Sequence, residues 1–124
     1  MWYYKDMGLT DVAAMVMNPR YPGKKARVKF LVDSGASYTA LPYDVVKQLA
    51  LKPSFEERFS LADGTEIKRK IGNAMVEYQG REVATPVILG QRGDNALLGV
   101  LTLEGLGLVL DPLKRELRQA HLRM

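Results

Sequence analysis

The chain of 124 residues contains no cysteine and only one histidine. The lack of cysteine excludes disulfide bonds, a thiol nucleophile and thiolate metal sites. The single histidine, His121, cannot supply a metal site with two histidine ligands, and we interpret it as a solvent-exposed tail residue. We therefore expect no metal site built on thiolates or on two histidines.

The sequence also lacks a long apolar segment and a single stripe of basic residues flanked by aromatic ones. No stretch approaches the roughly 20 apolar residues of a membrane span. The start, MWYYKDMGLT, has charges and a glycine where a secretory signal needs an unbroken apolar stretch. The 18 basic and 14 acidic residues are scattered, which favours a solvated surface over nucleic-acid binding. We expect a cytoplasmic protein without membrane or nucleic-acid partners; a fragment cut from a longer precursor is the alternative.

What the sequence does contain is a regular series of short apolar segments. The length and the apolar content of 47% fit a single domain, residues 1–124. Apolar segments separated by turn signals favour a mostly β fold. Strands are expected at residues 9–18, 26–33 and 106–111, with hairpin turns at 62–64 and 78–80. Short helices are expected at residues 43–51 and just before Gly105, and residues 113–124 fit either a strand or a fraying helix.

The chemistry that these residues leave open is that of carboxylates. The segment GASYT around Ser37 lacks the second glycine of a nucleophile elbow, and the glycines match neither a Walker A loop nor a dinucleotide fingerprint. Of the seven aspartates, only Asp33 follows an apolar strand. Carboxylates rarely end buried strands without a partner or a task. Asp33 therefore either accepts hydrogen bonds within its own turn or has a chemical role.

The surroundings of Asp33 favour the chemical role. The segment VDSGA, residues 32–36, resembles the active-site signature of aspartic proteases. The segment ALLG, residues 96–99, resembles the two apolar residues and glycine that pack beneath that site, and SLADGT, residues 60–65, falls where a flap hairpin would lie. The order, the spacing and the length of half a two-lobed enzyme resemble the retroviral-type (retropepsin-like) aspartic proteases, especially their single-domain cellular and prokaryotic branch. The resemblance extends from about Gly8 to Leu117.

This resemblance implies a mostly antiparallel closed β barrel with one or two short α-helices, paired into a homodimer. Because the signature occurs once in the chain, Asp33 of each protomer would meet its mate on a twofold axis, and the two would activate water to hydrolyse a peptide bond without a metal or another cofactor. The active-site loop would comprise Ser34, Gly35 and Ala36, with a supporting segment of Leu97, Leu98 and Gly99. The flap, expected as a stiff two-residue turn over a peptide or protein substrate, would comprise Ala62, Asp63, Gly64 and Thr65.

Two other functions stay open from the sequence. The same dimeric fold would be a peptide-binding module with little turnover if a constrained flap or an imperfect dimer misplaced the water. A purely structural β domain would make the pairing of DSGA with ALLG a coincidence. Replacement of Asp33 by asparagine separates these functions, because an enzyme loses turnover with its fold kept, whereas a binding module keeps its ligand.

Overall fold

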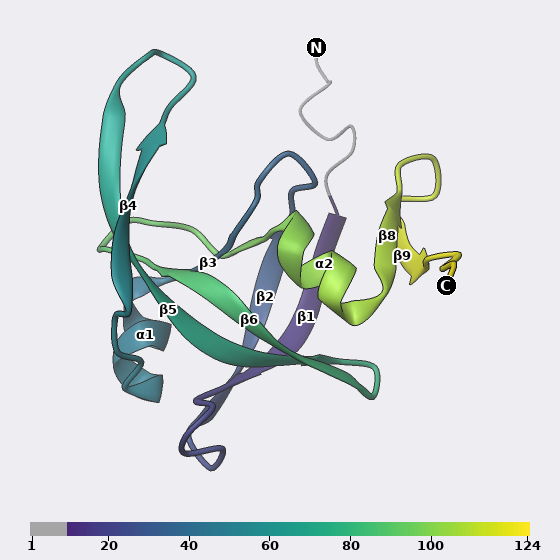
Figure 1. Ribbon diagram of the computed structural model, residues 1–124, viewed down its shortest axis with the longest axis horizontal. Coiled ribbons are helices and arrows are strands. Elements are labelled where there is room, and N and C mark those ends of the chain that lie inside the picture. The colour runs from purple at the N-terminus through teal and green to yellow at the C-terminus, as the bar shows by residue number, and fades with distance from the viewer. Residues whose placement is uncertain (1–9) are drawn as a thin grey trace.

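The first two strands follow the alternation of their side chains. In the computed structural model, which describes residues 10–124, they are β1 (Thr10–Met17) and β2 (Lys25–Val32), paired antiparallel (Figure 1). Successive side chains of a strand point to opposite faces. Along β2 this alternation buries Phe30 and Val32 completely, so that the strand ends inside the core. Both predicted strands are confirmed.

The middle of the chain forms two successive hairpins. Their strands are β4 (Phe55–Ser60), β5 (Glu66–Tyr78) and β6 (Arg81–Leu89), with β5 shared between the hairpins. The first part of β5 is mostly exposed, whereas Ile71, Ala74 and Val76 further along are buried. The predicted turns lie between these strands, and the first hairpin, whose strands are mostly exposed, projects from the rest of the sheet (Figure 1).

Two very short strands join these parts into one sheet. They are β3 (Thr39–Leu41) and β7 (Leu97–Leu98), and the seven strands follow the order β1-β2-β7-β3-β6-β5-β4. The pairs β2–β7 and β3–β6 are parallel and the other described pairs are antiparallel. Because β2 and β7 run in the same direction, the residues that follow them, Asp33 and Gly99, meet at the same edge of the sheet. Strand β1 pairs not only with β2 but also with β5, so the order of paired strands returns to β1.

Two helices of seven residues each accompany the sheet: α1 (Tyr43–Leu49) and α2 (Val100–Leu106). The first follows Pro42, whose fixed φ suits the start of a helix. The second ends at Gly107, which has a φ of 72° and so takes the left-handed conformation that terminates many helices. The first helix was predicted at residues 43–51 and ends two residues earlier, and the second, predicted only by its end near Gly105, ends one residue later. Helix α2 packs against β6.

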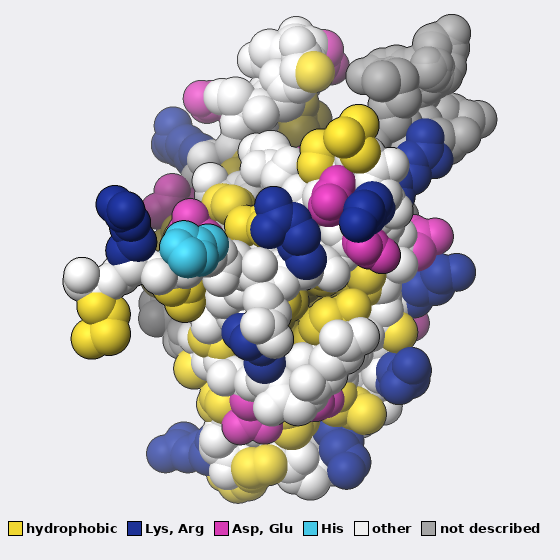
Figure 2. All heavy atoms as spheres, turned by 90° about the vertical axis from the view of Figure 1, so that its right-hand side faces the viewer, with side chains coloured by type: hydrophobic (Ala, Val, Ile, Leu, Met, Phe, Trp, Pro, Cys, Tyr) yellow, Lys and Arg dark blue, Asp and Glu magenta, His cyan; other side chains and the backbone are white. Residues whose placement is uncertain are grey.

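The C-terminal end forms a small sheet of its own. It consists of β8 (Leu108–Asp111) and β9 (Glu116–Gln119), paired antiparallel. Of the two predictions for this end, the strand is therefore correct. On the face that carries this hairpin, acidic and basic side chains are interspersed with apolar ones (Figure 2). Neither helix of the described chain is long and apolar enough to cross a membrane.

Candidate active site

Asp33 lies directly after the buried end of β2. Its backbone N–H donates to the carbonyl oxygen of Leu98 at 3.0 Å, and its own carbonyl oxygen accepts from the N–H of Ala36 at 3.1 Å. Its Oδ1 atom accepts from the N–H of Gly35 at 2.9 Å. The side chain is half-buried, and among residues 10–124 no basic group forms an ion pair with it. The loop thus orients one carboxylate oxygen and leaves the group without a neutralising cation.

The segment expected to support this loop lies beneath it. Leu97 and Leu98 pair with the last two residues of β2, and Leu98 is completely buried. A Cβ atom added to Gly99 would lie 2.4 Å from the carbonyl oxygen of Tyr38, which is closer than atoms approach without a backbone shift. Beyond Gly99, the N–H of Val100 donates to the carbonyl oxygen of Ala36 at 2.8 Å. The structure therefore brings the two sequence segments together, in contact through backbone hydrogen bonds.

A buried hydroxyl network fixes this contact from below. The hydroxyl groups of Thr39 and Thr102 lie 2.6 Å apart, and that of Thr102 lies 3.1 Å from the hydroxyl of Thr85. Thr39 Oγ1 also accepts a hydrogen bond of 3.0 Å from the N–H of Gly99. Thr39 and Thr102 are fully buried, and Thr85 is 3% exposed. Buried polar groups with partners hold a single geometry, so this network connects β3, β6 and α2 under the Asp33 loop.

The residues expected in the flap, Ala62, Asp63, Gly64 and Thr65, lie in the turn between β4 and β5. The N–H of Gly64 donates to the carbonyl oxygen of Leu61 at 3.0 Å, which forms a turn with Ala62 and Asp63 at its centre. The N–H of Leu61 donates to the carbonyl oxygen of Thr65 at 2.7 Å, so Gly64 adds one residue to the expected two-residue turn. Asp63 accepts bonds from the N–H and the hydroxyl of Thr65. These bonds, the hydroxyl bond first, lower the pKa of Asp63 below its ordinary value. Gly64 has a φ of 89°, and the turn is exposed.

Two contacts hold the flap hairpin against the rest of the chain. The ring of Phe59 on β4 packs edge-on against the ring of Tyr38, with 6.0 Å between the ring centroids. Nearer the base, Arg69 on β5 binds Asp94 with two hydrogen bonds of 2.6 and 3.0 Å. This hydrogen-bonded ion pair lowers the pKa of Asp94 and raises that of Arg69. Asp94 belongs to the segment that leads into β7, so the pair connects the flap hairpin with the supporting segment.

Neither the threonine network nor the Arg69–Asp94 pair was predicted from the sequence. Each of the three threonines lies next to apolar residues, in YTAL, LTLE and VATP. This apolar surrounding was the one sign in the sequence that their hydroxyl groups are buried. Asp94 follows Gly93 in a turn sequence, QRGD, and its Oδ2 accepts from the N–H of Gln91 at 2.8 Å. Nothing in the sequence indicates that Arg69, 25 residues away, would reach it.

The described residues contain no cluster of three or more acidic or histidine side chains suited to a metal ion. Hollows of about 360, 250 and 230 Å³ occur elsewhere on the surface and are lined by other residues than Asp33. In the Asp33 loop, Ser34 and Gly35 are exposed and Asp33 is half-buried directly after the end of β2.

Comparison with known sequences and structures agrees with this geometry. Residues 23–105 match the family described as "gag-polyprotein putative aspartyl protease". The fold is similar to that of the EIAV protease in complex with the inhibitor HBY-793, with 15% identity, complete coverage of both chains and a TM-score of 0.62. It is also similar to the simian foamy virus protease, with 20% identity over 77% of this chain and 92% of the other and a TM-score of 0.53.

A bacterial structure is more similar in sequence. The retropepsin-like aspartic protease from Rickettsia conorii is 27% identical, with coverage of 84% of this chain and 85% of the other and a TM-score of 0.51. No protein with a curated description matches the sequence. The family match spans most of the chain and includes the Asp33 loop, the flap turn and the supporting segment. The chain therefore belongs to the gag-type, retropepsin-like aspartic protease family, which supports a hydrolase of the peptidase type.

Proposed function

We propose that the chain is an aspartic endopeptidase whose active site is formed by the Asp33 carboxylates of two copies. The proposal rests on the surroundings of the Asp33 carboxylate. Asp33 follows a strand with a buried end, and the N–H of Gly35 orients its Oδ1. No cation among residues 10–124 forms an ion pair with it. The aspartate loop occurs once per chain, and a twofold axis places identical residues opposite one another. The second carboxylate therefore comes from a second copy.

The chemistry follows from two neighbouring carboxylates that share one proton. The ionised Asp33 removes a proton from a bound water molecule, and the oxygen of that water attacks the carbonyl carbon of the peptide bond. The protonated Asp33 of the other copy donates its proton to the carbonyl oxygen, which gives a neutral tetrahedral intermediate. Transfer of the first proton to the amide nitrogen, with return of a hydroxyl proton from the intermediate to the second Asp33, then breaks the C–N bond, releases the acid and the amine, and leaves the pair sharing one proton again. Water is consumed, and no cofactor takes part.

The loop residues have distinct roles in this proposal. Gly35 donates its backbone N–H to the carboxylate at a distance that requires close approach of the main chain, since an added Cβ would lie 3.3 Å from Asp33 Oδ1. The exposed hydroxyl of Ser34 is free to bond to the loop of the second copy. Ala36 and the segment Leu97–Gly99 position the loop through the backbone bonds described above.

The substrate in this proposal is a peptide or an extended segment of a protein. Such a chain binds as an added strand, through backbone hydrogen bonds, in the cleft between the flap turns and the two Asp33 loops. The turn of Ala62, Asp63, Gly64 and Thr65 closes over it and excludes water. The series of strand pairings that returns to β1 supports the closed barrel that would give this cleft a rigid floor.

The C-terminal hairpin is the proposed contact between the two copies. Strands β8 and β9 form a sheet with no other described strand, so each has an edge available for further pairing. Near this sheet, Leu113 and Leu122 are 93% and 72% exposed. The segment MWYY at the N-terminal end is a second candidate for this contact, and it lies outside the described residues.

The test compares the parent protein with Asp33→Asn on a diverse peptide mixture between about pH 3.5 and 8, with cut sites read by mass spectrometry. Asp44→Asn, which changes an exposed carboxylate on α1, is the matched control. Cleavage by the parent and the control but not by Asp33→Asn supports the proposal. If the folded, dimeric parent binds peptides without cleaving them, the chain is a peptide-binding module instead.

A further inference from the structure

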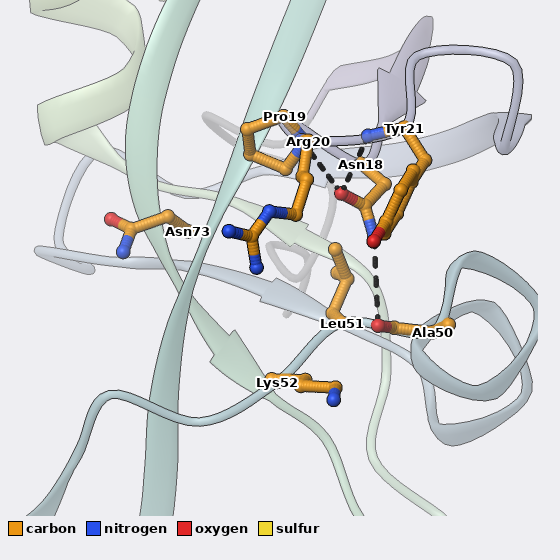
Figure 3. A pocket seen from close by; sticks show the side chains of 8 residues that line it. All are labelled: Asn18, Pro19, Arg20, Tyr21, Ala50, Leu51, Lys52 and Asn73. Carbon is orange, nitrogen blue, oxygen red and sulfur yellow. Dashed lines mark hydrogen bonds between the residues drawn. The ribbon is translucent and has the colours of Figure 1, made fainter.

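A hollow of about 360 Å³ lies away from the Asp33 loop, between the β1–β2 turn, the end of α1 and the middle of β5 (Figure 3). Its lining includes no residue of the active-site loop, the flap turn or the supporting segment. Pockets for small molecules commonly enclose about 300 to 1,000 Å³, so this hollow is large enough for a compact organic molecule. The proposed peptidase reaction makes no use of it.

Buried contacts of Asn18 shape the hollow. Its Nδ2 donates to the carbonyl oxygens of Leu49 and Ala50, at 2.8 and 3.5 Å, at the end of α1. Its Oδ1 accepts from the backbone N–H groups of Arg20 and Tyr21, at 2.8 and 3.1 Å. Asn18 is only 6% exposed, and these four bonds use its full capacity for hydrogen bonding. The turn is therefore fixed against the helix end, and the walls of the hollow are preformed.

Four polar side chains on the rim are uncommitted. The side chains of Arg20, Tyr21, Lys52 and Asn73 line the hollow, and within the described chain none of them forms a hydrogen bond or an ion pair. Figure 3 shows the Arg20 guanidinium extending from the turn into the space between Asn73 and Leu51. Leu51 is 8% exposed and gives the floor an apolar surface. The ring of Tyr21 is 56% exposed and available for stacking.

The charge at this place is positive. Two of the lining residues are basic and none is acidic. The segment 18–29, which contains the turn, carries five basic residues and no acidic one. A guanidinium binds carboxylate or phosphate groups with two parallel hydrogen bonds, and an ammonium group adds a point charge. The hollow thus combines two cations with an apolar floor.

We propose that this hollow binds a small organic anion. A carboxylate or phosphate group of the ligand lies between Arg20 and Lys52, and its apolar or aromatic body lies on Leu51 and the ring of Tyr21. The Asn73 amide, which can donate and accept, orients the ligand on the side of β5. This site is separate from the peptidase site, and its occupation does not depend on the proposed reaction.

The first test is a titration of the ¹⁵N-labelled protein, followed by backbone amide resonances. The probes are phenyl phosphate and phenylacetate. The controls are inorganic phosphate, which lacks the aromatic ring, and phenol, which lacks the anionic group. At least one of the two aromatic anions is expected to give saturable shifts of the amides of Arg20, Tyr21, Lys52 and Asn73, with an affinity at least about tenfold above both controls. The tighter of the two identifies the charged group. No saturable shift with either anion, or equal binding of phenol, overturns the proposal.

Two double variants distinguish binding of the anion in the hollow from its general attraction to a positively charged surface. The double variant Arg20→Gln/Lys52→Gln removes two positive charges from the lining, whereas Lys24→Gln/Lys25→Gln removes two from the same turn region but outside the lining. All four side chains are exposed, so both variants should keep the fold. We expect the first variant to weaken binding about tenfold or more and the second by less than about twofold. Equal weakening by both, or no weakening by the first, contradicts the proposed site.

Discussion

The Asp33 loop and the flap turn are both essential to the proposed reaction, but they are held in different ways. The loop is fixed by bonds between residues that lie far apart in the sequence, such as Thr39 and Thr102, 63 residues apart. The flap turn is fixed by bonds within Leu61–Thr65 and is exposed. A carboxylate pair requires a rigid geometry, whereas a lid must open. Changes in the loop should therefore cost both stability and activity, and changes in the flap turn should affect mainly its motion.

The largest effect is expected from Gly99→Ala. The added Cβ would lie 2.4 and 2.9 Å from the carbonyl oxygens of Tyr38 and Ser37, which are main-chain atoms and cannot move alone. We expect a loss of about 3 kcal/mol or more in the free energy of unfolding, measured by urea denaturation. Gly23→Ala is the control, because an added Cβ there meets no atom within 4 Å. Equal stability of the two variants would contradict the close packing beneath the loop.

The next effect is expected from Thr102→Val, which keeps the shape of the side chain and removes its hydroxyl. Thr39 and Thr85 then lose a buried hydrogen-bond partner. This loss costs about 1 to 3 kcal/mol of stability and should lower peptidase activity through the displaced loop. Thr102→Ser restores the hydroxyl and should recover part of both. If the serine variant is no better than valine, the network does not position the loop.

A smaller, pH-dependent effect is expected from Arg69→Gln. The pKa of Asp94 is lowered in the folded chain, chiefly by the hydrogen bond from Arg69. The pair therefore stabilises the fold at a pH above the ordinary range of aspartate, and this contribution is lost as the pH falls through the lowered pKa. At pH 7 the variant should lose about 1 kcal/mol of stability, and the difference from the parent should shrink in acid.

Urea denaturation at neutral and acidic pH measures this difference, with Lys70→Gln on the same strand as the control for the loss of a positive charge. A stability difference between the parent and Arg69→Gln that stays constant with pH would show that the ionised Arg69–Asp94 pair does not account for the lost stability.

The smallest effect on stability is expected from Asp63→Ala in the flap turn. Asp63 is exposed, and its bonds to Thr65 are local, so the unfolding curve should be unchanged within error. Its lowered pKa should nevertheless be visible in the parent: the amide resonance of Thr65 should titrate below the ordinary range of aspartate and cease to titrate there in the variant. A marked loss of stability would remove the contrast between the loop and the flap.

The sequence predicted the elements that depend on local pattern. Apolar segments between turn signals indicated β1 and β2, turn residues indicated both hairpins, and the two apolar residues before Gly99 indicated the supporting segment. It failed where distant residues meet. The hydroxyl contacts of Thr102 and the pairing of Arg69 with Asp94 depend on which strands become neighbours, and this is set by the order β2-β7-β3-β6. The hollow at Asn18 likewise forms from three segments that are separate in the sequence.

The central claim, that two copies each supply one Asp33, is tested most directly by mixing. The parent and Asp33→Asn are unfolded together, refolded at different ratios with constant total protein, and assayed on a peptide that the parent cleaves. A shared site makes mixed dimers inactive, so activity should follow the square of the parent fraction and fall to about a quarter in an equal mixture. A linear fall to about half would show that each chain carries a complete site, and would contradict the proposed dyad.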